Sequence, residues 1–226
     1  MNADKTNSES TFRTPLVTEL LLMILDILEE EYSPWRLPLN FRSPFELMVS
    51  VSLSAQTTDA AVNRVTPELF RRWPNPQALA GADPQELEVV IHSLGFFRQK
   101  ARNLIGAATR LVEVYGGKLP CEMEDLTSLP GIGRKCANVI RSQYWNLPGI
   151  TVDTHFGRVC RRLGLTEETD PTKVEYNLGE QIPVERWNEF SMTANLHGRR
   201  YCMSRKPSCR ECPLNEICPK RGVTSI

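Results

Sequence analysis

Four cysteines lie close together near the end of the 226-residue chain, in a spacing typical of a metal site. Disulfides are rare in cytosolic proteins, so a tight cysteine cluster in a cytosolic chain indicates metal binding. Four thiolates bind either Zn²⁺ or an iron–sulfur cluster, and the spacing alone leaves both open. The pattern is Cys202-x6-Cys209-x2-Cys212-x5-Cys218. The other three cysteines are scattered and are expected to be small buried residues: Cys121, Cys136 and Cys160.

A second candidate site is the stretch Leu129-Pro130-Gly131-Ile132-Gly133, which joins two predicted helices. Its two glycines are expected to adopt backbone angles that other residues resist, and they leave no side chain in the way. Backbone N–H groups and the positive end of the following helix would then form a phosphate site. The pattern resembles the helix-hairpin-helix motif of DNA-binding proteins, which contacts the DNA backbone rather than the base sequence. An ordinary tight turn between two helices is the alternative.

A lysine and an aspartate next to this stretch define a candidate cleft. Lys135 follows the hairpin beside Arg134, where the helix dipole and the neighbouring cation disfavour its charged form. An uncharged lysine amine is a nucleophile, although a plain phosphate contact is the simpler role. Asp153 lies in Val152-Asp153-Thr154-His155, just before an arginine-rich predicted helix. An aspartate there would cap the helix, and the same carboxylate can also serve catalysis.

The distribution of charge is more informative than its total, which is zero. Residues 1–32 hold seven acidic and two basic residues, whereas residues 134–162 hold six basic residues and one acidic residue. Residues 196–226 hold seven basic and two acidic residues. A basic face is the footprint of phosphate contact, with a solvated run of charges as the alternative.

The apolar spacing predicts an all-α chain. Residues 44–56 are almost wholly apolar, so that predicted helix is expected to be buried. Residues 1–14 are polar and are expected to form a disordered tail. Helices are predicted over residues 15–31, 44–56, 58–73, 83–94, 97–115, 122–129, 134–145, 154–163, 171–182 and 184–196, with a short one near Leu214.

Two features of the sequence bear on its location. No apolar run reaches the roughly 20 residues that cross a membrane. The first residues are polar and contain no signal-peptide core. We therefore expect a cytoplasmic protein without a membrane partner.

These motifs resemble a known family. The stretch from Leu129 to Lys135, followed by Val152-Asp153-Thr154-His155, resembles the active-site signature of the endonuclease III family. The 6-2-5 cysteine spacing resembles the [4Fe–4S] loop of that family and of its adenine-excising relative. Ser54-Ala55-Gln56-Thr57-Thr58-Asp59 is also similar to the family. The resemblance spans about residues 37–221 plus the first helix, and its motifs occur in the family's order.

The resemblance implies an all-α helix-hairpin-helix glycosylase fold, in which two helical domains flank a DNA-binding cleft. One domain would be a six-helix module over residues 37–148. The other would combine a helix over residues 15–36 with residues 149–226, which carry the C-terminal [4Fe–4S] loop. Lys135 would then lie on one side of the cleft and Asp153 on the other.

The implied activity is that of a bifunctional DNA glycosylase and abasic-site lyase in base excision repair. The damaged base is flipped out of the duplex, because it cannot be reached inside the stack. Lys135 would attack C1′ of the deoxyribose, and the base leaves. The resulting Schiff base allows β-elimination of the 3′ phosphate, while Asp153 stabilises the cationic sugar and assists proton transfer. Oxidised pyrimidines such as thymine glycol, or abasic sites, in double-stranded DNA are the implied substrates of a monomeric enzyme, which in a bacterium would lie with the nucleoid.

Several further residues are expected to contact DNA by the same resemblance. Gln56 would enter the gap left by the flipped nucleotide, and Phe96 would act as an apolar wedge unless it is a core residue. His155 would contact the backbone near the cleft, with a structural histidine as the alternative. Arg205 and Lys206 would face phosphate, or only solvate the loop. The hairpin contacts would come from Leu129, Gly131, Gly133 and Arg134, and His197-Gly198-Arg199 would brace the cluster.

Three rival functions have their own signatures. The adenine–mismatch glycosylase shares the hairpin, the aspartate and the cysteine loop, but it lacks the lysine and has a glutamate where this chain has Val51. It also carries an extra C-terminal domain, whereas this chain ends eight residues after Cys218. A DNA-binding module without catalysis would not need both Lys135 and Asp153. A zinc-stabilised interaction domain would be colourless.

Overall fold

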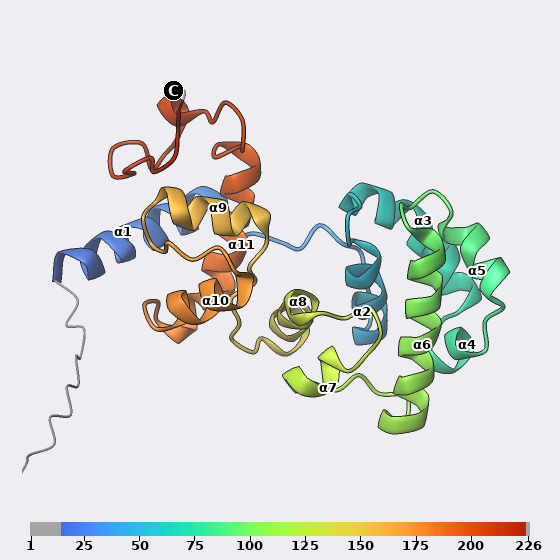
Figure 1. Cartoon of the computed structure of the whole chain (residues 1–226). Coiled ribbons are helices and arrows are strands. Elements are labelled where there is room, and N and C mark those ends of the chain that lie inside the picture. Colours follow the sequence, from blue (N-terminus) through green and yellow to red (C-terminus); the bar gives the residue numbers. More distant parts are fainter. Residues whose placement is uncertain (1–14, 225–226) are drawn as a thin grey trace, which may run out of the picture.

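The computed structural model describes residues 15–224, and for residues 15–18 it describes the backbone only. The tail predicted over residues 1–14 lies outside the described residues. Within residues 15–224 every regular element is helical, as predicted (Figure 1). The elements are α1 Pro15–Tyr32, α2 Pro44–Leu53, α3 Asp59–Arg72, α4 Pro76–Ala80, α5 Pro84–Ile91, α6 Phe97–Tyr115, α7 Met123–Thr127, α8 Arg134–Trp145, α9 Thr154–Arg162, α10 Pro171–Gly179, η1 Val184–Arg186, α11 Trp187–Arg200 and η2 Cys209–Glu211.

Two short elements differ from the sequence prediction. Helix α4 was not predicted, because five residues are too few for a periodic pattern; Asn75 caps it and Pro76 begins it. The helix predicted near Leu214 is wrong. That residue lies in a turn, where its carbonyl accepts from the N–H groups of Ile217 and Cys218. The nearest helical turn is η2, a 3₁₀ segment.

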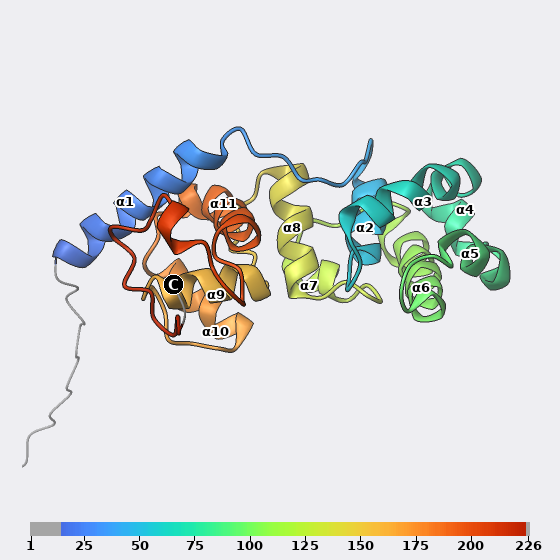
Figure 2. The same cartoon turned by 90° about the horizontal axis from the view of Figure 1, so that it is seen from above.

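The chain builds two separate hydrophobic cores. The first lies among α2 to α8 and runs from Leu39 to Ile140. The second combines residues 21–28 of α1 with residues from Ile150 to Leu214. Figures 1 and 2 show the corresponding halves, with α1, α9, α10 and α11 on one side, α2 to α6 on the other and α8 between them. Helix α1 therefore belongs in space with the end of the chain.

The link between the cores is a short segment after α8. The buried Asn138 of α8 donates from Nδ2 to the carbonyl of Ile150 at 3.1 Å. On either side of Ile150 the chain lies along α11. The Gly149 N–H donates to Asn188 Oδ1 at 3.0 Å, and the Thr151 N–H donates to Ser191 Oγ at 3.0 Å. Alternate residues of an extended segment thus meet residues one helical turn apart.

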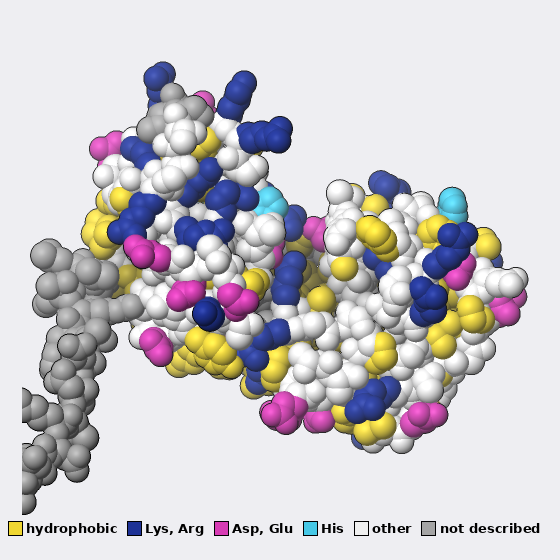
Figure 3. Space-filling model, viewed as in Figure 1, with side chains coloured by type: hydrophobic (Ala, Val, Ile, Leu, Met, Phe, Trp, Pro, Cys, Tyr) yellow, Lys and Arg dark blue, Asp and Glu magenta, His cyan; other side chains and the backbone are white. Residues whose placement is uncertain are grey.

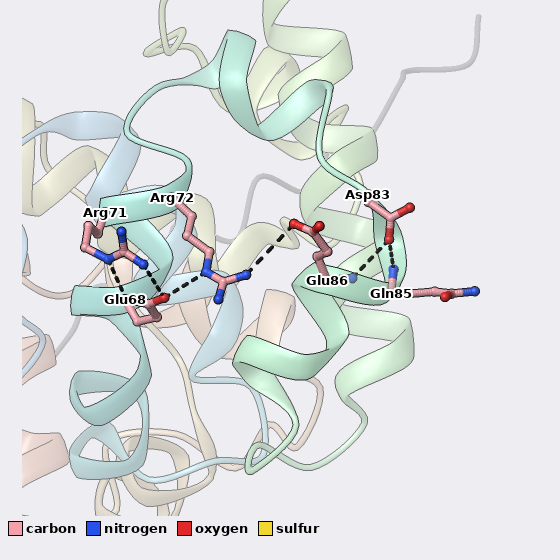
Figure 4. A network of polar contacts seen from close by, with 6 residues as sticks. All are labelled: Glu68, Arg71, Arg72, Asp83, Gln85 and Glu86. Atoms are coloured by element: carbon pink, nitrogen blue, oxygen red, sulfur yellow. Dashed lines mark hydrogen bonds and ion pairs between the residues drawn. The ribbon is translucent and has the colours of Figure 1, made fainter.

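A cap on α5 and an exposed ion pair between α3 and α5 lie at the surface of the first half (Figure 4). Asp83 accepts from the N–H groups of Gln85 and Glu86 and caps α5, an interaction worth about 1 kcal/mol. Arg72 bridges Glu68 of its own helix and Glu86 of α5. Exposed pairs of this kind add little to stability, so packing holds this half together.

None of the helices in residues 15–224 combines the length and the apolar character that a membrane crossing demands.

The bond between Asn138 and Ile150 gives the first prediction. Asn138→Ala should lower the free energy of unfolding in urea by about 1–3 kcal/mol, because a buried carbonyl loses its partner. Ser142→Ala is the matched control, since the Ser142 hydroxyl bonds only to Val139 of its own helix. Equal losses in the two variants would contradict a special role for this link.

Candidate active site

The hairpin between α7 and α8 is anchored by two side chains that are buried in the first core. Leu129 and Ile132 are 2% and 3% exposed, and the Ile132 N–H donates to the Leu129 carbonyl at 3.0 Å. Helix α6 supports the turn, because Gly106 leaves just enough room for Pro130 and Arg110 donates to the Ser128 hydroxyl. The Leu129 side chain is thus a core residue, so any contact of Leu129 with DNA must come from its backbone.

The two hairpin glycines serve different purposes. Gly131 has φ of +80°, and a Cβ there would lie 2.9 Å from Asn103 of α6. The prediction that a glycine is required by backbone angle is confirmed at this position. It is wrong for Gly133, whose φ of −88° and ψ of 174° suit any residue. No heavy atom lies within 4 Å of a Cβ built at Gly133, so this glycine leaves an open approach to the first N–H groups of α8.

Lys135 and Asp153 line the same pocket, at the boundary between the two halves. Lys135 is exposed in the first turn of α8, and the half-buried Asp153 is the N-cap of α9. The pocket has a volume of about 120 Å³. Its lining draws on α2, α8 and α11 and includes Ser54, Thr57, Asp59, Cys136, Thr151, Asn195 and Arg199. The structure thus brings together the two residues that the sequence named as nucleophile and carboxylate.

The Asp153 carboxylate is fixed through both oxygens. Oδ1 accepts from the N–H of Phe156 at 2.8 Å and caps α9, as predicted. Oδ2 accepts from Asn195 Nδ2 of α11 at 2.6 Å. Asn188, Ser191 and Asn195 lie on one face of α11, so this bond continues the contacts that hold the segment from Gly149. No sequence motif indicated this role of Asn195.

Much of the basic stretch over residues 134–162 is used inside the protein. Arg134 forms a bidentate pair with Glu175 of α10, at 2.7 and 2.9 Å, and lies over the Tyr176 ring. Arg158 donates to the carbonyls of Gly198 and Cys202. Arg162 donates to three successive carbonyls, those of Cys202, Met203 and Ser204. The side chains of Arg134, Arg158 and Arg162 are thus engaged within the protein, and Lys135 is the basic residue of this stretch that lines the pocket described above.

Gln56 and Phe96 lie in loops with unusual backbone angles. Gln56 follows α2 with φ of +52°, and Phe96 precedes α6 with φ of +57°. Non-glycine residues seldom adopt this region, and such strain concentrates at functional sites. Gln56 is exposed, and Phe96 is 68% exposed, which rules out the alternative of a core phenylalanine. The prediction that the helix at 44–56 reaches Gln56 is wrong, because the left-handed residue lies beyond its end.

His155 lies between the pocket and the cysteine loop. Its ring Nδ1 is 3.2 Å from Arg158 Nη2, and its Cβ and carbonyl pack against Gly198, where a Cβ would come within 2.9 Å. These contacts fix His155 at the junction of α9 and α11, where the residue stays half-buried.

The four clustered cysteines surround one apolar pocket in the second half. Within residues 15–224, no three His, Cys, Asp or Glu side chains are arranged as ligands of a single ion. N–H donors face the sulfurs: Arg162 Nη1 lies 3.3 Å from Cys202 Sγ, and the Lys220 N–H lies 3.3 Å from Cys218 Sγ. Burial raises the pKa of the Cys212 thiol to about 11, so a cationic centre is needed to hold this sulfur as a thiolate.

The surroundings of this cysteine pocket include one contact that the sequence suggested and one that it did not. His197 is buried, with Nε2 3.4 Å from Cys212 Sγ, which fits the expected bracing role. Its Nδ1 lies 3.1 Å from the Tyr32 hydroxyl at the end of α1. Arg205 and Lys206 are exposed on the same loop. Basic side chains gather on this half in Figure 3, where a notch separates it from the other half.

Comparisons with known proteins identify relatives across most of the chain. Residues 49–184 match the family described as HhH-GPD superfamily base excision DNA repair protein. Endonuclease III of Synechocystis is 47% identical over 203 residues, covering 89% of this chain and 91% of the relative. Endonuclease III of Escherichia coli K12 is 36% identical over 205 residues, covering 91% and 97%. A solved trapped covalent intermediate of endonuclease III with DNA has a TM-score of 0.86, is 37% identical, and covers 90% of this chain and 96% of its own.

The contrast between the hairpin glycines is testable. Gly131→Ala should lower the free energy of unfolding by about 1 kcal/mol or more, because the new side chain meets Asn103 at a positive φ. Gly133→Ala should leave stability unchanged or slightly higher. Urea unfolding of the two purified variants decides the point, and a Gly133→Ala loss as large as that of Gly131→Ala would refute the distinction.

Proposed function

Because the chain belongs to the HhH-GPD superfamily of base excision DNA repair proteins and to its endonuclease III family, we propose that it removes oxidised pyrimidines through a lysine Schiff base. The family makes it an enzyme, a DNA glycosylase and abasic-site lyase that acts on DNA. The finer proposal concerns which bases it removes, which residues act and how the strand is then cut. One observation carries it: Lys135 and Asp153 line a single pocket between the two cores.

Lys135 is the proposed nucleophile. Its exposed amine attacks C1′ of the flipped deoxyribose, and the base leaves with the bonding electrons. Loss of a proton from the amine and opening of the sugar ring give a Schiff base. The proton on C2′ is then acidic enough for β-elimination, which breaks the bond to the 3′ phosphate. A thymine glycol, whose ring is no longer planar, stacks poorly and is therefore cheap to extrude.

Asp153 is the proposed carboxylate of the reaction. Its two fixed oxygens sit beside the site where positive charge develops on the sugar, and a preorganised anion stabilises that charge without reorganising. The bond from Asn195 holds Oδ2 in place, while the cap bond to Phe156 holds Oδ1. The capping role and the catalytic role thus belong to one side chain.

The proposed DNA contacts follow from exposure. Gly131 would shape the turn, and the backbone N–H groups at the start of α8, which Gly133 leaves open, would hold a phosphate. Arg134 would contribute through its backbone since its side chain pairs with Glu175. Gln56 and Phe96 would fill the space of the extruded nucleotide. Leu129 would support the turn from the core, because its N–H donates to the Leu126 carbonyl and its carbonyl accepts from the Ile132 N–H. The remaining proposed phosphate contacts are His155, Arg205 and Lys206.

The cysteine pocket is proposed to hold a [4Fe–4S] cluster. The donor set fits, because four sulfurs surround one apolar pocket and N–H donors point at two of them. Cys202, Cys209, Cys212 and Cys218 would be its ligands. The bound cluster supplies a covalent tie for a loop that has little core of its own. Arg162 donates to the Met203 and Ser204 carbonyls of the same loop, so that Arg205 and Lys206 lie on an ordered backbone.

The two cores are proposed to be two domains that grip the DNA from either side, with α1 and residues 149–226 in one and residues 37–148 in the other. A single chain supplies both walls of the pocket, so a monomer suffices. An enzyme that acts on chromosomal DNA works where the chromosome lies, which in a bacterium is the nucleoid within the cytoplasm.

Borohydride trapping tests the nucleophile. The protein is mixed with a duplex containing one thymine glycol, and sodium borohydride reduces any Schiff base to a stable covalent complex. The native protein should be trapped and Lys135→Gln should not. Release of the base without a trapped species would make Lys135 a phosphate contact of a monofunctional glycosylase. Trapping only at an abasic site would keep the mechanism and reject thymine glycol as the substrate.

The cluster has its own test. The purified protein should be yellow-brown, with absorbance near about 400 nm and about four iron atoms per chain. Cys212→Ser should lose most of the iron. Cys121→Ser is the control, because the Cys121 thiol does not line the pocket and donates instead to Glu122. A colourless protein with one bound zinc per chain would refute the cluster.

A further inference from the structure

Lys100 is a buried cation in the first core without an ion pair. The residue is 6% exposed, and no carboxylate pairs with it among residues 15–224. Its Nζ donates to Thr57 Oγ1 at 2.6 Å, and burial lowers the pKa of the amine. A buried lysine destabilises a fold unless something compensates, so its presence calls for a reason.

The partner of Lys100 lies in the loop of Gln56. Thr57 Oγ1 accepts from Lys100 and donates to the carbonyl of Ala55 at 3.2 Å. The bond to Ala55 spans Gln56, and the bond from Lys100 holds the Thr57 side of its left-handed backbone. The Thr57 N–H also donates to the Ser54 carbonyl at 3.1 Å, so the turn is closed while Gln56 stays exposed.

The other end of the same lysine belongs to the loop of Phe96. The Lys100 N–H donates to the Phe96 carbonyl at 3.0 Å and begins the hydrogen-bond ladder of α6. Phe96 is the left-handed N-cap of α6 and makes no side-chain cap bond, so this backbone bond ties it to the first turn of the helix. The side chain of Lys100 and its backbone thus join two strained loops that are 40 residues apart in the sequence.

We propose that Lys100 is a positioning residue that fixes the loops of Gln56 and Phe96 relative to each other, so that both side chains enter the DNA together. The inference rests on the proposed function, in which these two residues fill the space of the extruded nucleotide. The bond from Nζ to Thr57 sets the distance between the loops, and the first turn of α6 sets the direction of Phe96. Lys100 itself touches neither DNA nor the reacting atoms.

A structural role and a positioning role predict opposite results for stability. Burial lowers the pKa of Lys100, so at neutral pH the charged amine destabilises the fold, and the penalty fades as pH rises toward the ordinary lysine value. Lys100→Met removes the charge and keeps the packing. The variant should therefore be as stable as the native protein or more so, while losing function.

The test uses a duplex with a tetrahydrofuran abasic analogue opposite 2-aminopurine, whose fluorescence rises when it is unstacked. Titration with the native protein should raise the fluorescence. Lys100→Met and Thr57→Val should each weaken this response roughly 10-fold or more, because small misplacements at such a site have large effects. Thr57→Val keeps the lysine charge, so it separates the bond from electrostatics. The double variant should lose no more than either single one.

Lys118→Met is the matched control, since Lys118 is exposed beyond the other end of α6. Borohydride trapping at a natural abasic site is run on the same preparations. Lost fluorescence with retained trapping in Lys100→Met supports the inference. An unchanged fluorescence response in both Lys100→Met and Thr57→Val would overturn it. No fluorescence response from the native protein would overturn the proposed roles of Gln56 and Phe96, and the inference with them.

Discussion

The site depends on the short segment that joins the two cores. Two hydrophobic cores can pack independently, so the distance between a residue of one and a residue of the other must be set by what joins them. Here the joint is short: Asn138 of α8 bonds to Ile150, and Thr151 and Asp153 are hydrogen-bonded to α11. Asp153 is the end of that tied segment. Lys135 lies one turn before Asn138 on α8, so a single helix relates the lysine to the joint.

The same arrangement determines which basic side chains near the pocket stay exposed. Arg134 is paired with Glu175. Arg158 and Arg162 donate to the carbonyls of Cys202 and Met203, so these three side chains stabilise the fold. The exposed cations are left at Lys135 and on the cysteine loop. Of these three arginines only Arg134 is paired with a carboxylate, because the carbonyls that hold Arg158 and Arg162 do not neutralise their charge. A chain of zero net charge can therefore keep positive charge around the site.

The sequence predicted what is local. The hairpin, the cap at Asp153 and the end of α6 at Gly116 each depend on residues within one turn of each other, so their patterns could be recognised without a fold. The contacts from Asn195 to Asp153, from Arg134 to Glu175 and from Lys100 to Thr57 join residues about 40 apart, and nothing in the spacing indicates them. The backbone angles were needed to show that Gly131 is required by its positive φ, whereas Gly133 only leaves space at the start of α8. Family resemblance placed Lys135 and Asp153 on opposite sides of a cleft, whereas spacing alone left Lys135 as a phosphate contact.

The central claim is that the Lys135 amine forms the bond to C1′ in the pocket it shares with Asp153. The most direct measurement is peptide mapping by mass spectrometry of the borohydride-reduced adduct, after nuclease digestion of the DNA. The account predicts the added deoxyribose fragment on the peptide that contains Lys135, and on no other amine. A fragment found instead on Lys206 or Lys220 of the cysteine loop would contradict it.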